Sequence, residues 1–424
     1  MIPSFLRIPG RGGKLSDRLN RLVVITAFLG IGAGGWGLWL ETDDALDRAA
    51  SREKITRACG GLVDPDPVLG LNGGTDRARP GSDGEDVMSG LDDGSDPLAA
   101  LPQLCVIYRV GEPGTSYGHF QLSAWQTPSD EYAQLVDGWD DPFEDWSGKN
   151  RGSTRRTADS AEYPLGDGRL GRYTDDAVTV KADCPNKPDG VTSVNVMAAA
   201  LYDTGDAEVT DADRRTLATL ARTAAERLAD RTGCTTELPA LRAELPTPGK
   251  RLTPAATAKG TCAWYAAYLG EQGRGRLPDR ALATPAGTHA SQESCLLAVS
   301  DGDVERIWSG LGEKEIGDRG DPGTPWWLRA ESFFGDEAGE VKAEGLGTDQ
   351  TALTPGTAGF DDSANVWWAS ATCAGEPALH TLTVPYPYDR YIRPRLRALF
   401  QAYVDDVAAR RDCTGLEFPT DFSP

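Results

Sequence analysis

The sequence predicts an α+β protein with two tandem homologous domains after one N-terminal transmembrane helix. Each domain is expected to be an antiparallel sheet with flanking helices and two disulfides. Three observations predict this organisation. An uncharged apolar run covers Leu22–Leu40, eight cysteines follow it at spacings that repeat, and one helical pattern recurs in both halves of the remaining chain.

The apolar run Leu22–Leu40 is long enough to cross a membrane, because a helix of this length spans roughly 28 Å, about one hydrocarbon core. Basic side chains precede it and acidic side chains follow it from Glu41 onward. The positive-inside rule therefore predicts a cytoplasmic tail at 1–21, a stalk at 41–50 and an extracellular remainder. A cleaved signal peptide is the alternative, but the run is longer than usual and ends in bulky Trp and Leu. We expect a single-pass signal anchor in the cell membrane.

The charge of the chain excludes one class of function. Asp and Glu number 64 against 43 Lys and Arg, which gives a formal net charge of −21. Proteins that bind nucleic acid need basic surfaces that replace phosphate counterions, so no nucleic-acid partner is expected.

The eight cysteines all follow the apolar run, and an even number in an oxidising compartment predicts disulfides. The first four are separated by 46, 79 and 50 residues and the last four by 33, 78 and 40, which indicates a duplication. Four cysteines allow three pairings in each half. Locality favours the bridges Cys59–Cys105, Cys184–Cys234, Cys262–Cys295 and Cys373–Cys413.

A helical pattern supports the duplication. A helix is predicted from about Asp211 to Arg231, with Thr210 as N-cap and Asp213 completing a capping box. Shifted by 179 residues, its apolar face recurs at Leu396, Leu399, Phe400, Tyr403 and Val407.

Strands also repeat, since an alternating run that ends at Cys184 has a counterpart that ends at Cys373. We therefore assign 50–245 and 253–420 to two α+β repeats, joined by a Pro/Thr-rich linker at 246–252.

The anchor, the CGGL segment after a polar stalk, the strand-borne cysteines and the final AERLADRTGC helix together resemble uncharacterised single-pass, membrane-anchored ectodomain proteins of streptomycetes. More distantly, the chain is similar to actinobacterial cell-surface lipoproteins of unknown function with two disulfides per domain. It departs from the lipoproteins because it lacks a lipobox. The resemblance implies no catalytic residue.

One motif suggests catalysis. Gly114 to Gly118 matches the G-x-S-x-G elbow around Ser116, with His119 beside it. An elbow needs a strand before the serine and a helix after it, whereas strand-like runs flank this motif on both sides. A β-hairpin is therefore the favoured interpretation, and a hydrolase that uses Ser116 is the alternative.

Other polar groups do not form a recognisable centre in the sequence. His119, His289 and His380 lack metal-binding spacing, and no metal or cofactor is expected. Acidic clusters at Asp137–Asp145 and at Asp301 with Asp303 are interpreted as solvated loops, with weak calcium binding or carboxylate-based hydrolysis as alternatives.

Tryptophans are the most informative candidates for ligand contact. Trp125, Trp139 and Trp146 lie in the middle of the first repeat, and the second repeat contains Trp308, Trp326, Trp327, Trp367 and Trp368. Neighbours on one strand point to opposite faces, so Trp367 and Trp368 cannot share one core. The candidate ligand or interface aromatics are Trp326, Trp327 and Trp368, although core packing is the competing interpretation.

The sequence thus predicts a membrane-anchored extracellular, non-catalytic envelope protein without catalytic residues. Its expected partners are the cell membrane, through residues 22–40, and an envelope protein, a glycan or a small ligand. A membrane-anchored extracellular hydrolase, carboxylate- or Ser116-based, is the alternative.

Overall fold

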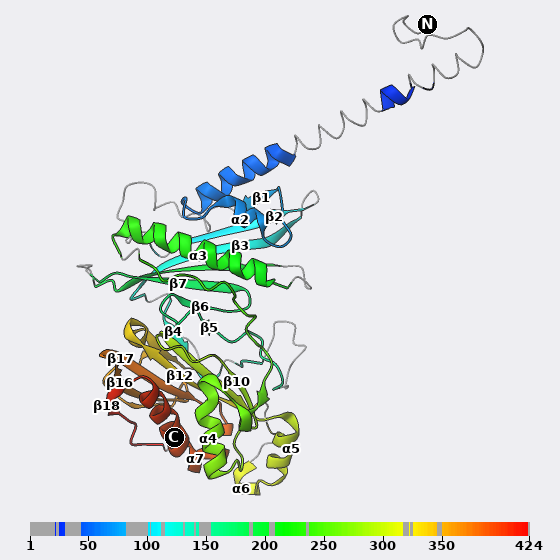
Figure 1. The fold of residues 1–424 in the computed structure, drawn as a ribbon. Helices are drawn as coiled ribbons and strands as arrows, with labels where there is room; N and C mark the ends of the chain where they lie inside the picture. Colours follow the sequence, from blue (N-terminus) through cyan, green and yellow to red (C-terminus); the bar gives the residue numbers. More distant parts are fainter. Residues whose placement is uncertain are drawn as a thin grey trace, which may run out of the picture.

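The computed structural model describes parts of the chain between residues 22 and 422 (Figure 1). The described residues are 22, 25–29, 44–81, 101, 103–111, 115–129, 132–139, 141–143, 154–185, 190–202, 208–234, 237–316, 322, 325–345 and 350–422. No helix within these ranges is long and apolar enough to cross a membrane. The predicted tail 1–21 and the predicted span Leu22–Leu40, apart from residues 22 and 25–29, lie outside the described residues.

The first half of the chain, defined here as the residues up to 245, forms an antiparallel sheet. Within the described ranges, its strands follow the order β1-β2-β3-β8-β7-β6-β5. The bounds are β1 Ala78–Pro80, β2 Gln103–Val110, β3 Ser116–Thr127, β5 Tyr163–Pro164, β6 Gly171–Tyr173, β7 Ala177–Asp183 and β8 Ser193–Ala200.

Helices cover one face of this sheet. α3 (Asp211–Thr232) begins with the predicted capping box, in which the Thr210 hydroxyl accepts a hydrogen bond from the backbone N–H of Asp213. Its apolar stripe packs on the inward side chains of β7 and β8, which alternate along each strand. α2 (Pro65–Gly70) and a helix over residues 44–58 complete the layer, and the latter includes part of the predicted stalk.

The second half, from residue 253 onward, forms another antiparallel sheet. Among the described strands the order is β15-β16-β17-β12-β11-β10-β9, and β18 pairs with the end of β16. The bounds are β9 Thr253–Pro254, β10 Arg280–Ala283, β11 Gln292–Ala298, β12 Trp327–Phe334, β15 Gly359–Asp361, β16 Val366–Cys373, β17 Glu376–Thr383 and β18 Cys413–Glu417.

α4 (Ala263–Gln272) and α7 (Tyr388–Arg410) pack on this sheet, and the apolar face predicted for α7 is buried as expected. Trp326 stacks on Tyr388 with ring centroids 5.3 Å apart. Trp367 is buried while Trp368 is half-buried, which confirms that they face opposite sides of β16. The remaining short helices are η3 Ala255–Thr257, η4 Gly260–Cys262, α5 Asp301–Ser309, α6 Glu313–Ile316 and η5 Gly335–Gly339.

Disulfides fasten each sheet to a neighbouring segment. The four bridges are Cys59–Cys105, Cys184–Cys234, Cys262–Cys295 and Cys373–Cys413, which confirms the pairing expected from locality. Each bridge stays within one half, so the halves are stapled separately. By restricting the unfolded chain, such bridges typically stabilise a domain by about 2–4 kcal/mol each.

Each half extends a loop that contacts the other half (Figure 1). β4 (Gln134–Val136), from the first half, pairs in parallel with β13 (Val341–Glu344) of the second, and β14 (Gln350–Ala352) pairs with β13. In the opposite direction, η5 reaches the open face of the first sheet, where the Lys181 ammonium pairs with the carboxylates of Asp336 and Glu337.

Candidate functional site

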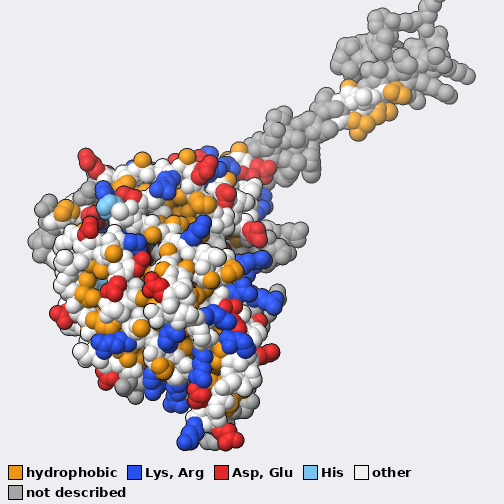
Figure 2. Space-filling view, turned by 60° about the horizontal axis from the view of Figure 1, so that its bottom comes forward, with side chains coloured by type: hydrophobic (Ala, Val, Ile, Leu, Met, Phe, Trp, Pro, Cys, Tyr) orange, Lys and Arg blue, Asp and Glu red, His pale blue; other side chains and the backbone are white. Residues whose placement is uncertain are grey.

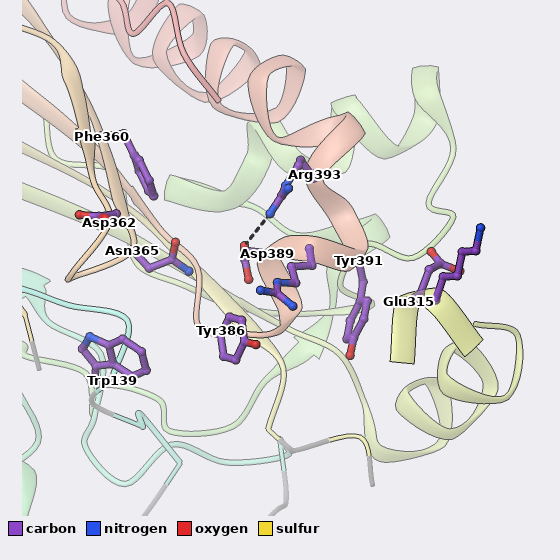
Figure 3. A pocket seen from close by; sticks show the side chains of 11 residues that line it. Trp139, Glu315, Phe360, Asp362, Asn365, Tyr386, Asp389, Tyr391 and Arg393 are labelled. Atoms are coloured by element: carbon purple, nitrogen blue, oxygen red, sulfur yellow. Dashed lines mark ion pairs between the residues drawn. The ribbon is translucent and has the colours of Figure 1, made fainter. Parts of the chain in front are cut away.

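The candidate site is an open pocket of about 510 Å³ where the first half meets the start of α7 (Figure 3). We call it the Trp139 pocket. Among the described residues, Trp139 comes from the first half. The others come from the second half, namely from α6, β15, the turn after β15, Tyr386 just before α7, and the first turns of α7. The second-half residues are Lys314, Glu315, Phe360, Asp362, Asn365, Tyr386, Asp389, Arg390, Tyr391 and Arg393.

Trp139 is positioned by the turn that follows β4. The carboxylate of Asp137 accepts a hydrogen bond from the backbone N–H of Trp139 at 2.8 Å, which closes an Asx turn. The N–H of Gly138 donates to the carbonyl of Ala364 at 2.8 Å, and the indole N–H of Trp139 donates to the carbonyl of Ser363 at 2.6 Å. The side chain remains 40% exposed, so its ring is fixed yet accessible.

The opposite wall begins at Tyr386, just before α7. Tyr386 is 41% exposed, and the guanidinium of Arg390 lies 4.7 Å from its ring centroid, within range of a cation–π interaction. Phe360 is less available, because its ring stacks on Trp367 with centroids 4.4 Å apart. Two exposed rings from different halves therefore stand at the same pocket.

Asp389 is the buried polar group of the pocket, in the first turn of α7. The residue is only 3% exposed, and its Oδ2 lies 3.6 Å from Nη2 of Arg393 one turn later. Among the described residues, none forms a hydrogen bond with its Oδ1 or with Nε of Arg393. Burial raises the pKa of Asp389, while the backbone N–H of Arg390 and the charge of Arg393 oppose the rise.

The other carboxylates of the pocket differ from Asp389. Glu315 accepts two hydrogen bonds from Arg276, at 2.5 and 3.3 Å, which hold its pKa below the ordinary value. Asp362 is exposed to solvent. The pocket thus offers one buried acceptor, several donors and two ring faces, a combination suited to binding a polar molecule with an apolar face.

Within the part of the chain that the structure describes, the G-x-S-x-G segment brings no general base to the hydroxyl of Ser116. Ser116 begins β3 and lies opposite Val110 on β2, so the segment belongs to an antiparallel hairpin, as predicted. Its hydroxyl accepts a hydrogen bond from Nε of Arg79 at 3.1 Å. His119 is buried, with Nε2 2.8 Å from the carbonyl of Val68, and burial lowers its pKa.

The other two histidines lie apart from the pocket. His289 is exposed and lies 2.8 Å from Arg169, measured between Nε2 and Nη2. His380 is fully buried; its Nδ1 is 2.7 Å from the hydroxyl of Ser332, which is 2.7 Å from that of Tyr403. Burial lowers the pKa of His380 to about 4, so the ring is neutral near pH 7. No sequence pattern predicts this buried network, because its members lie on three separate elements, β12, β17 and α7.

The tryptophans singled out from the sequence lie elsewhere. Trp326 is fully buried against Tyr388 and α7, so it belongs to the core. Trp327 is buried in a small apolar cluster with Phe143 of the first half, which makes it a contact between halves. Trp368 is half-buried, and its indole N–H donates to the hydroxyl of Thr357 at 3.3 Å. None of the three lines the Trp139 pocket.

The two acidic clusters singled out from the sequence have different roles: one shapes a turn and the other forms ion pairs. Of Asp137–Asp145, residues 137–139 and 141–143 are described, and Asp137 shapes the turn that carries Trp139. Asp303 pairs with Arg274 and Arg306. The described residues contain no group of three or more His, Cys, Asp or Glu side chains arranged to hold a metal ion.

Comparison with known proteins gives no relative from which a function could be transferred. No protein-family model, no curated protein and no solved structure matches the chain. The function must therefore be inferred from the residues of the pocket themselves.

Proposed function

We propose that the protein is a membrane-anchored extracellular, non-catalytic envelope protein that binds its ligand in the Trp139 pocket. The observation that carries the proposal is the composition of the pocket. A buried carboxylate, Asp389, has an oxygen without a hydrogen bond from the described residues, and an exposed ring, Trp139, is fixed across from it by the other half. Unpaired buried acceptors are costly in folded proteins, so their presence favours a ligand that supplies the missing donor.

The proposed anchor is the apolar run at Leu22–Leu40. Its described residues, 22 and 25–29, are helical and leave Ile25, Phe28 and Leu29 exposed, which is expected of a segment whose surroundings are lipid. The disulfides are consistent with an oxidising compartment. Reporters fused after Pro424 test the topology: a reporter active only outside the membrane should work, and activity of a cytoplasm-only reporter would contradict it.

We also propose that the two halves arose by tandem duplication. The strand order β1-β2-β3-β8-β7-β6 in the first sheet parallels β10-β11-β12-β17-β16-β15 in the second. In each half, one disulfide involves the second strand of this order, β2 or β11. The other joins the residue that ends or follows β7 or β16 to a cysteine just after the long helix, α3 or α7. A duplication places equivalent loops, those after β3 and β12, at the contact between halves.

The hydrolase remains the second candidate, and it makes a different prediction. The hydroxyl of Ser116 contacts Arg79, whose guanidinium donates hydrogen bonds and has no acceptor atom, so it cannot serve as a general base. We expect the full chain and its Ser116→Ala variant to hydrolyse 4-nitrophenyl acetate no faster than buffer. Turnover that disappears in the variant would favour the hydrolase.

The binding proposal is tested with the full chain immobilised from detergent micelles. Fractions of cell-envelope extract are passed over wild type, Trp139→Ala and a matched control, Tyr117→Ala, whose side chain is similarly exposed at 39% but lies on the β2–β3 hairpin. Retention of a component by wild type and by the control, but not by Trp139→Ala, is expected. Equal retention by all three proteins would contradict binding at the pocket.

A further inference from the structure

We propose that the Trp139 pocket takes an uncharged saccharide chain as its ligand, an inference that rests on the proposed function of the pocket. Three features of the pocket lead to this class of ligand: its two exposed rings, its buried donor and acceptor, and its balance of charge.

The exposed rings offer flat apolar surfaces. A pyranose ring presents C–H groups on its faces and hydroxyls around its edge, so it packs well on an aromatic face whose surroundings are polar. The N–H of Trp139 is bound by the carbonyl of Ser363, which fixes the indole in place while 40% of the residue stays exposed. Tyr386 supplies a second ring with 41% exposure on the α7 side.

The buried polar atoms suit hydroxyl groups. Oδ1 of Asp389 is an acceptor that receives no hydrogen bond from the described residues. Nε of Arg393 is a donor that makes no hydrogen bond to them. The two side chains lie one helical turn apart and form an ion pair, which Figure 3 shows inside the pocket. A sugar hydroxyl both donates and accepts, so neighbouring hydroxyls can satisfy the two atoms together.

The charges favour a neutral ligand over an ionic one. Among the described residues of the lining, Lys314, Arg390 and Arg393 are basic, and Glu315, Asp362 and Asp389 are acidic. A ligand cation would compete with the guanidinium of Arg390 for the ring of Tyr386. An anionic polymer would be repelled by the net charge of −21 on the chain. Figure 2 shows that acidic and basic side chains are interspersed on the face it draws.

The test measures retention of the full chain, in detergent micelles, on beads that carry uncharged oligosaccharides of glucose, mannose or N-acetylglucosamine. Parallel beads carry an acidic oligosaccharide or a lysine-rich peptide. The variants are Trp139→Ala and Asp389→Leu, with Tyr117→Ala as the control for loss of an exposed ring. The temperature of unfolding is recorded for each variant, and Trp139→Ala, at an exposed position, is expected to fold normally.

Wild type and Tyr117→Ala should be retained on at least one uncharged oligosaccharide, with affinity at least about tenfold above that of Trp139→Ala and Asp389→Leu. Failure of every uncharged oligosaccharide to retain wild type, or equal retention of Trp139→Ala, overturns the saccharide assignment. If only the acidic oligosaccharide or the peptide shows Trp139-dependent retention, the saccharide assignment falls and the binding function stands. Absence of any Trp139-dependent retention here and from envelope extract contradicts both.

Discussion

The indole N–H of Trp139 donates a hydrogen bond of 2.6 Å to the carbonyl of Ser363, a residue 224 positions later in the chain. The bond joins a turn of the first half to the turn between β15 and β16 of the second. Because it lies at the rim of the pocket, the contact that holds the halves together there also sets the position of a ring that a ligand can reach.

This bond separates two roles of Trp139. Trp139→Phe keeps an aromatic ring but removes the N–H donor, so ligand affinity should fall between those of wild type and Trp139→Ala. Loss of one hydrogen bond of about 0.5–1.5 kcal/mol corresponds to a decrease of several-fold. Affinities from the extract-retention experiment provide the measurement, and a Phe variant as weak as the Ala variant would show that ring area is not what matters.

Gly168 should be intolerant of a side chain because the halves approach closely there. A Cβ at Gly168 would lie 2.4 Å from the backbone of Ala290, whereas a Cβ at Gly166 would meet no atom within 4 Å. Both glycines have positive φ, so backbone strain is common to the two sites. We expect Gly168→Ala to lower the free energy of unfolding by about 1–3 kcal/mol more than Gly166→Ala in urea titrations. Equal losses would contradict the close approach.

The contact between Lys181 and η5 should make stability depend on pH. Burial, together with the neighbouring Asp336, raises the pKa of Glu337 from its ordinary 4.5 to about 7, against the opposing charge of Lys181. A carboxyl whose pKa is raised on folding stabilises the folded state below pH 4.5, and this contribution is lost as the pH rises to 7.

Wild type should therefore lose stability relative to Glu337→Gln between pH 4.5 and 7.5, by up to about 3 kcal/mol. Although burial opposes it, the hydrogen bond with Glu337 and the charge of Lys181 lower the pKa of Asp336, so Asp336 acts below pH 3.8 and stays outside this window. Folding lowers the pKa of His380 from 6.5 to about 4, so its contribution to stability also changes in part of this window. Because His380 is present in both proteins, the difference in their melting temperatures isolates Glu337. A difference that is constant with pH would refute the assignment.

The disulfides should be complete and confined to their halves. Mass spectrometry of non-reduced tryptic peptides should find the four observed bridges and no free thiol. Replacing Cys373 and Cys413 by serine should cost roughly 2–5 kcal/mol of unfolding free energy. A bridge between a cysteine of residues 59–234 and one of residues 262–413 would contradict disulfide pairing within each half.

The features that local patterns determine could be predicted from the sequence. The capping box at Thr210 and Asp213 and the apolar stripe of α7 depend on residues three or four positions apart. The hairpin at Ser116 follows from two strand-like runs around a short turn. The disulfide partners were the nearest ones along the chain, because each bridge joins neighbouring elements.

The pocket could not be predicted, because its parts meet only in the folded chain. Trp139 lies in an acidic segment without periodicity, and its position depends on the pairing of β4 with β13, about 200 residues later. In the sequence, Asp389 has the pattern of an ordinary acidic residue in the first turn of a helix. Such residues interact with the positive end of the helix dipole and are expected to be exposed. The turn after β15 and Tyr386 line the same pocket, and no sequence pattern marks either of them.

A ligand site formed by both halves is tested most directly by hydrogen–deuterium exchange of the full chain with and without the retained fraction of envelope extract. If the ligand binds in the Trp139 pocket, exchange should slow both in residues 137–139 of the first half and in residues 361–365 and 386–393 of the second. Slower exchange confined to one half, or located at the Ser116 hairpin instead, would contradict a ligand site formed by both halves.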